Sequence, residues 1–277
     1  MYNLDKKNLT KYLGDKKSVS LKNGKVFYRE SGAGIPIFFL HGMSGESSSW
    51  VYQLEGLKDQ YRIIAWDAPG YAQSTAIDCD IATLAETAFD FLQSIGASNP
   101  ILVGHSMGGV IAGKMAIDRP EKIKALVLSC THWGWGITPG EPLISRYTKR
   151  LDELNTMNLE DYAKLRASKM ISPNIDEDIS IYLGELSKSV SSEAIKYVGR
   201  ANQEANNLDG LSKLNIPTFI LIGEIDKVIK ADKTEILAAN MPCAKQIFMK
   251  NVGHAPYVED PESYNSIIQS IAKEVLS

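Results

Sequence analysis

A serine flanked by glycines is the first feature of this sequence that could do chemistry. Residues 104–108 read Gly-His-Ser-Met-Gly, which matches the pattern G-x-S-x-G with Ser106 at its centre. The pattern follows a short apolar run at residues 101–103 and begins a helical pattern. A sharp turn from strand to helix exposes the hydroxyl of such a serine, and Gly104 and Gly108 leave room for neighbouring backbone. The sequence therefore predicts Ser106 as a nucleophile.

A serine hydroxyl attacks well only when a base removes its proton. The chain contains four histidines. One of them, His254, lies in the loop after the last apolar run, residues 246–249. A loop at the carboxyl ends of parallel strands can bring His254 over Ser106, so we interpret His254 as the base.

The base in turn needs a carboxylate that fixes its tautomer and stabilises the imidazolium ion. Asp226 lies in the loop after the apolar run at residues 218–222, within the sequence Gly-Glu-Ile-Asp. The order Ser, Asp, His along the chain, with Asp226 and His254 in loops after successive late strands, fits a nucleophile at such a turn. We therefore predict Asp226 as the acid, with Glu224 as the alternative.

The oxygen of an attacked carbonyl group becomes an anion that needs hydrogen-bond donors. The apolar run at residues 35–40 leads into His41-Gly42-Met43-Ser44-Gly45, a loop of small residues that can expose backbone N–H groups. We expect the backbone N–H groups of Met43 and Met107 to be the two donors. This chemistry requires no metal and no organic cofactor.

Six short apolar runs, separated by helical patterns, form the frame that must position these residues. Runs that are apolar on both faces are typical of parallel strands covered by helices on both sides. They occupy residues 35–40, 61–66, 101–103, 123–128, 218–222 and 246–249. Before them, Asn23-Gly24 between two alternating runs predicts an antiparallel hairpin. The predicted fold class is α/β, a mostly parallel central sheet flanked by helices on both faces.

The strand pattern stops between residues 134 and 208, which is longer than an ordinary connection. Apolar residues recur there at helical spacing, for example from Leu143 to Leu154 and from Ile179 to Val190. We therefore expect a helical cap at residues 134–208, inserted into a core domain made of residues 1–133 and 209–277.

Composition excludes several other classes of protein. The chain carries 30 Lys and Arg against 33 Asp and Glu, a net charge of −3, so a long basic face for nucleic acid is not expected. The apolar runs are far shorter than the roughly 18 residues of a membrane span. Residues 1–17 scatter lysine and aspartate where a signal peptide needs an apolar stretch, which favours a cytoplasmic protein. Three separated cysteines suggest buried free thiols.

These motifs resemble the α/β-hydrolase fold family, and within it the cap-bearing serine esterases and enol-lactonases. The matching segments are His41-Gly42 and residues 66–74, 104–109, 223–226 and 253–254. Family members commonly carry D-x-P-G-x-G-x-S after the second parallel strand, and here Ala72 replaces the second glycine. The resemblance implies the α/β-hydrolase fold and the Ser106, Asp226, His254 triad. We expect Asp67 to organise its loop rather than to catalyse.

We therefore expect a serine hydrolase that cleaves an ester, thioester or lactone, with a small acyl compound as substrate and no nucleic-acid partner. Trp50, Trp133 and Trp135 suggest a mostly apolar acyl pocket, with Trp135 and Gly42 as candidate substrate contacts. Two alternatives stay open. The same triad can serve C–C bond hydrolysis or cofactor-free peroxidation, or the fold can bind a small molecule without turnover. The sequence leaves the physiological substrate, the acyl chain length and the oligomeric state open.

Overall fold

The computed structural model describes residues 4–277, so the first three residues of the polar N-terminal segment and of the predicted core domain lie outside the described residues. An eight-stranded sheet runs in the order β1-β2-β4-β3-β5-β6-β7-β8. The strands are β1 (Lys17–Leu21), β2 (Gly24–Ser31), β3 (Pro36–Leu40), β4 (Arg62–Trp66), β5 (Ile101–His105), β6 (Ala125–Ser129), β7 (Thr218–Gly223) and β8 (Lys245–Met249). Strands β1 and β2 form the predicted hairpin, and β3 to β8 pair in parallel. The predicted fold class is confirmed.

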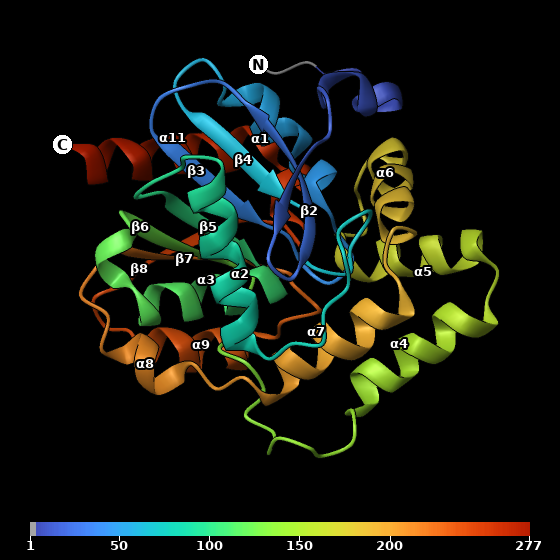
Figure 1. Cartoon of the computed structure of the whole chain (residues 1–277). Coiled ribbons are helices and arrows are strands. Elements are labelled where there is room, and N and C mark those ends of the chain that lie inside the picture. Colours follow the sequence, from blue (N-terminus) through green and yellow to red (C-terminus); the bar gives the residue numbers. More distant parts are fainter. Residues whose placement is uncertain (1–3) are drawn as a thin grey trace.

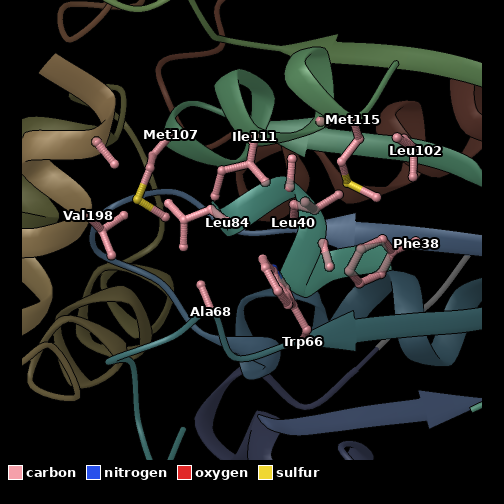
Figure 2. Close-up of a cluster of buried hydrophobic side chains, with 14 of the residues drawn as sticks. Phe38, Leu40, Trp66, Ala68, Leu84, Leu102, Met107, Ile111, Met115 and Val198 are labelled. Atoms are coloured by element: carbon pink, nitrogen blue, oxygen red, sulfur yellow. The ribbon is translucent and has the colours of Figure 1, made fainter. Parts of the chain in front are cut away.

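Both faces of the sheet are apolar because alternate residues of each central strand point to opposite sides. In β3, Phe38 and Leu40 pack in one cluster with α2 (Ile81–Ser94) and α3 (Met107–Asp118). Figure 2 shows this cluster, with the Met107 side chain reaching toward Val198. On the other face, Ile37 and Phe39 pack with α1 (Val51–Gly56) and α11 (Pro261–Leu276). Each fully buried side chain of this size stabilises the fold by about 1.5–3 kcal/mol.

The chain between β6 and β7 is helical and contacts both apolar clusters. It forms α4 (Ser145–Thr156), α5 (Leu159–Met170), α6 (Glu177–Ser187), α7 (Ser192–Glu204) and α8 (Leu208–Ser212). Figure 1 shows α4 to α7 gathered at the side of the sheet away from the C-terminal end of α11. Side chains of α4 and α7 join the first apolar cluster, those of α6 join the second, and α5 contributes Tyr162 to the first and Ala167 and Met170 to the second. The division into a core and a cap domain stays a prediction.

The N-terminal segment is more than a polar leader. Residues Lys6–Tyr12 form the 3₁₀ helix η1, which buries Leu9, and the following Leu13 is buried as well. Both leucines pack in the cluster that contains α1 and α11. Lys6 also pairs with Asp176 at 2.9 Å, at the start of α6. The few apolar residues of this segment, hidden among lysines, therefore fix it to the core.

Most predicted elements appear with ends shifted by one to three residues. Gly96, predicted to end a helix, adopts φ +63° just after α2, where glycine is favoured. Helix α9 (Ala231–Ala239) lies between two of the predicted strands, where a helix was expected without bounds, whereas the short α10 (Pro256–Glu259) and the 3₁₀ turns η2 (Ser47–Trp50) and η3 (Pro120–Lys122) were not expected from the sequence. Of the three thiols predicted to be buried, Cys79 and Cys130 are buried, whereas Cys243 is exposed. Among residues 4–277, every helix is too short or too polar to cross a bilayer.

Candidate active site

Ser106 occupies the turn between β5 and α3 in a conformation that few residues adopt. Its φ is 53° and its ψ is −118°, and it precedes the first residue of α3. Such strain costs about 1–3 kcal/mol. The turn is tight: a Cβ on Gly104 would lie 2.5 Å from the Gly108 carbonyl oxygen, and a Cβ on Gly108 would lie 2.1 Å from that of Leu40. Both glycines are therefore required by close backbone approach, as the sequence predicts.

The His254 and Asp226 side chains meet at the carboxyl ends of β7 and β8. His254 Nδ1 lies 2.8 Å from Asp226 Oδ2, and the two side chains are 4% and 5% exposed. The backbone N–H groups of Val228 and Ile229 donate to Asp226 Oδ1 at 2.7 and 3.0 Å. Burial opposes ionisation of this carboxyl, but the charge of His254 and these hydrogen bonds together lower the pKa of Asp226 below its ordinary value. Asp226 is therefore an ionised partner for His254 at neutral pH.

Glu224, the alternative acid, has another role in the structure. It is exposed, and its Oε2 accepts a hydrogen bond of 2.9 Å from the backbone N–H of Asn251. Asn251 adopts φ +57° in the loop that leads to His254. Glu224 thus ties two loops together, while Asp226 contacts the imidazole.

Glu259 at the end of α10 holds the loop that carries His254, and the sequence analysis missed it. Its carboxylate accepts hydrogen bonds from the backbone N–H groups of Gly253 and Ala255, each at 3.0 Å, and from that of Ser172 at 2.8 Å. The His254 N–H also donates to the Met170 carbonyl at 2.7 Å. The turn after α5 is therefore fastened to the loop on both sides of His254. The sequence alone does not reveal this role, because a glutamate near a helix end is in most proteins simply exposed to solvent.

The loop after β3 and the start of α3 are joined by buried Tyr71. Its hydroxyl lies 2.9 Å from Met43 Sδ and 3.5 Å from Met107 Sδ. Gly42 lies close to the nucleophile, because a Cβ there would be 3.1 Å from Ser106 Cβ. Met107 is the first residue of α3, where the backbone N–H has no acceptor within the helix. This arrangement is compatible with the two predicted oxyanion donors, whose role stays a prediction.

A cavity of about 480 Å³ lies over Ser106. Ser106, His254, Gly42, Met43 and Met107 all line it. The structure thus brings the predicted nucleophile, base and amide donors to one cavity. Beyond these, the wall consists mainly of residues from α4, α5 and the loop after β7, including several arginines and lysines.

The three tryptophans, from which we expected a mostly apolar acyl pocket, are not among the residues that line this cavity. Trp50 is fully buried beneath it, with ring centroids 4.7 Å from those of both Phe39 and Tyr257. Trp133 lies under the Lys233 ammonium group at 5.0 Å. The Trp135 ring packs 4.7 Å from the His132 ring and 4.9 Å below the Arg146 guanidinium. Trp135 therefore packs against Arg146. It is Arg146, and not Trp135 as we predicted, that lines the cavity.

Asp67 and Ala72 behave as loop residues. Asp67 is fully buried and accepts a hydrogen bond of 2.7 Å from the Ser47 N–H, while Lys16 Nζ lies 2.9 Å from its other oxygen. Ala72 adopts φ +48°, a conformation that glycine takes without strain. The family's glycine at this position is therefore explained by backbone geometry.

Among residues 4–277, one group of three side chains has metal-ligand atoms close together, namely Cys130, Asp226 and His254, within 4.8 Å. Metal binding requires a thiolate at Cys130. Burial raises the pKa of the Cys130 thiol well above its ordinary value, and the nearby Asp226 charge raises it further. Because His254 and Asp226 already pair with each other, the donor set fits a hydrogen-bonded pair better than a metal centre.

Three buried histidines around the site are held neutral. His41 donates from Nδ1 to the Gly42 carbonyl at 2.8 Å and accepts the Ala68 N–H at Nε2 at 3.0 Å, which only the neutral ring can do. Burial lowers the pKa of His41 and His132 to about 4 and that of His105 to about 3. These rings therefore stay uncharged across the physiological pH range.

We expect the free energy of unfolding to fall between pH 7 and pH 5.5. The folded-state pKa values of His41, His105 and His132 lie below that of an unfolded histidine, so only the unfolded state takes up protons in this window. Between pH 7 and pH 5.5, each of these histidines should lower the free energy of unfolding by about 1 kcal/mol, and the three together by about 3 kcal/mol. Urea unfolding followed by circular dichroism measures this directly. The His132→Asn variant should show about two thirds of the slope, whereas a flat profile in the wild type would contradict the assignment.

Comparison with known proteins gives a consistent result. A family model described as alpha/beta hydrolase fold matches residues 35–146. An (E)-2-((N-methylformamido)methylene)succinate hydrolase of Acinetobacter baylyi is 25% identical over 92% of this chain and 97% of its own. Lipase 3 of a Moraxella species is 29% identical over 88% of this chain and 80% of its own. The structure of the enol-lactonase from Burkholderia xenovorans superposes with a TM-score of 0.83 at 15% identity, covering 93% of this chain and all of that one.

Proposed function

Because the chain belongs to the α/β-hydrolase fold family, we propose that it is a serine hydrolase that cleaves an ester, thioester or lactone through an acyl-enzyme intermediate. The observation that carries this proposal is the buried 2.8 Å contact between His254 and Asp226, beside a cavity that Ser106 also lines. A buried ionised carboxylate paired with histidine is what a serine nucleophile needs for activation.

In the proposed first step, Ser106 Oγ attacks the carbonyl carbon of the substrate while His254 Nε2 accepts the hydroxyl proton. Asp226 holds the other ring nitrogen, Nδ1, as a donor, which leaves Nε2 free to act as the base. The imidazolium ion then protonates the leaving oxygen or sulfur, and the carbon–heteroatom bond breaks. Ser106 remains acylated.

The tetrahedral intermediate carries a negative oxygen, which the Met43 and Met107 N–H groups are proposed to stabilise. A single donor of this kind typically contributes a factor of about 10²–10³ to turnover. Water then attacks the acyl-enzyme, His254 accepts its proton, and the serine returns to its starting state. We further propose that residues 134–208 act as a cap over this cavity, and that Gly42 lets substrate approach closely.

The names of the relatives support the same reaction class. One relative is a hydrolase of a methylene succinate compound, another is a lipase, and the enol-lactonase shares the fold. Hydrolysis of a C–C bond, cofactor-free peroxidation and binding without turnover use the same scaffold and stay as alternatives. We favour acyl hydrolysis because a lipase and an enol-lactonase, whose names describe that chemistry, are among the proteins that this chain is similar to.

We expect a fluorophosphonate probe to label Ser106 covalently. Attack by the activated hydroxyl on phosphorus expels fluoride, so one phosphonyl group should be gained per chain. Peptide mass spectrometry locates the adduct. Ser44 also lines the cavity and serves as an internal control, while Ser129 is fully buried. An adduct on either of them, or none anywhere at the concentration that labels a reference esterase, would remove Ser106 as nucleophile.

A further inference from the structure

The cavity over Ser106 gathers positive charge in a chain whose net charge is −3. A single carboxylate, that of Glu153, lines the cavity beside six cationic side chains. These are Arg146, Lys149, Arg150, Arg166, Lys169 and Lys227. They come from α4, α5 and the loop after β7, so the positive charge of the cavity does not come from a single lysine-rich segment of the chain. Cations gathered around a concave site focus a positive potential into it.

Most of this charge is not neutralised by the protein. Glu153 pairs with Arg166 and with Lys169, the latter at 3.2 Å. Within the described part of the chain, the other four cationic side chains of the cavity have no acidic partner in an ion pair. The cavity therefore retains a surplus of cations that an anionic ligand can neutralise.

Arg150 is the most informative of these residues. Its Nη2 donates to the Met43 carbonyl at 3.0 Å and to Ser44 Oγ at 2.6 Å, which fixes the guanidinium beside the loop that carries a proposed oxyanion donor. Its Nε is buried and has no hydrogen-bond partner among residues 4–277. The same holds for Nε of Arg166, whose side chain is only 9% exposed. Buried donors without acceptors are costly.

Arg146 adds a third guanidinium at the wall. Its Nη2 donates to the Val228 carbonyl at 3.0 Å, next to the loop of Asp226, and its plane lies over the Trp135 ring. These contacts restrict the guanidinium without neutralising it. The methylene stems of the arginines and lysines supply apolar surface along the same cavity.

We propose that the acyl group of the substrate ends in a carboxylate that binds at Arg150, with Arg146 and Arg166 around it. This inference rests on the proposed hydrolase function and names its substrate class. Guanidinium groups match carboxylates in geometry, and charge-assisted hydrogen bonds are about twice as strong as neutral ones. An aliphatic chain between the ester and the carboxylate lies along the methylene stems. A neutral acyl chain would instead leave the surplus positive charge of the cavity without a counter-charge.

Matched methyl esters test this proposal. Monomethyl succinate, adipate and suberate are compared with methyl butyrate, hexanoate and octanoate, in which a methyl group replaces the carboxylate at equal chain length. We expect kcat/KM to be about tenfold to a hundredfold higher for the acidic partner of at least one pair, measured by methanol release. That advantage should shrink with added sodium chloride, because salt screens the attraction. Equal or better hydrolysis of the neutral esters would overturn the proposal and leave the hydrolase function intact.

Variants test whether Arg150 is the residue that binds the carboxylate of the substrate. Arg150→Met should lower the ratio of acidic to neutral kcat/KM about tenfold, and the ratio cancels any effect on the nearby Met43 loop. Lys213→Met is the matched control, since Lys213 pairs with Asp209 on the surface, and its ratio should equal that of the wild type. An unchanged ratio in Arg150→Met would exclude Arg150 as the contact. If Arg150→Met does not fold, the salt dependence of the wild-type ratio decides.

A binding measurement separates this inference from the proposed function. If Ser106 is labelled by the phosphonate but none of the methyl esters turns over, calorimetric titration of Ser106→Ala with monomethyl adipate and with methyl hexanoate decides. Tighter binding of the acidic ester supports the carboxylate site, and equal or absent binding rejects it. If Ser106 is not labelled and none of the esters turns over, the proposed hydrolase function fails, while the same titration still reports on the carboxylate.

Discussion

Replacing Ser106 with alanine is expected to lower kcat for ester hydrolysis by about 10⁴ to 10⁶. The nucleophile would be lost, while the cavity, His254 and the proposed oxyanion donors remain. Residual activity over water should come from binding and from the oxyanion donors alone. The measurement is kcat on the best methyl ester, with active protein counted by phosphonate titration of the wild type.

Stability provides the control for this substitution. Ser106 sits at φ 53°, and alanine at that position bears the same backbone strain. The free energy of unfolding should therefore stay within about 0.5 kcal/mol of the wild type. Ser106→Gly would relieve the strain, so it should be about 1 kcal/mol more stable and equally inactive. A folded Ser106→Ala that keeps more than a hundredth of the activity would show that another group performs the attack.

The sheet could be predicted from sequence because buried parallel strands have a strong local signature. Every residue of β3 and of β5 is buried, and β3 and the first three residues of β5 are continuous apolar runs. The turn at Ser106 was predictable for a similar reason. Only glycine fits where the Leu40 carbonyl lies 2.1 Å from a would-be Cβ at Gly108.

The cavity wall could not be predicted, because it depends on packing between distant segments. Helix α5 buries Arg166 on the face that carries Tyr162 and Met170, and an apolar pattern does not anticipate a buried arginine. Trp135 was expected to face substrate, since aromatic residues often line pockets. In the structure its ring is covered by Arg146, which follows it by eleven residues along a loop of no regular pattern. Sequence spacing cannot tell which of two such neighbours faces the cavity.

The acid of the triad could be predicted from the sequence only in part. The loop after β7 offers two carboxylates, Glu224 and Asp226, and their spacing does not distinguish them. The difference appears only in three dimensions, where the N–H groups of Val228 and Ile229 orient Asp226 toward His254. Glu224 instead accepts from Asn251.

Asp226→Asn is expected to lower kcat about 10⁴-fold, the loss known for this change in serine proteases. The Asn oxygen can keep the hydrogen bonds from Val228 and Ile229. Its NH₂ group would then face His254 Nδ1 and donate to it. That arrangement places the ring proton on Nε2, where the ring can no longer accept the proton of Ser106. The variant should therefore fold and bind substrate, with the loss confined to kcat.

Glu224→Gln is the matched control, since it removes the other carboxylate of the same loop. Its amide oxygen can still accept the Asn251 N–H, so activity should stay within about threefold of the wild type, because surface polar substitutions of this kind cost little. Both variants are compared by kcat on one ester and by their unfolding transitions. A folded Asp226→Asn that keeps more than a tenth of the activity, together with a Glu224→Gln that loses most of it, would move the acid role to Glu224. If both remain active, no carboxylate of this loop assists His254, and the 2.8 Å contact with Asp226 is structural. Because the side chains of His254 and Asp226 are almost completely buried, water cannot substitute for the missing carboxylate, and a large loss in Asp226→Asn alone is the expected result.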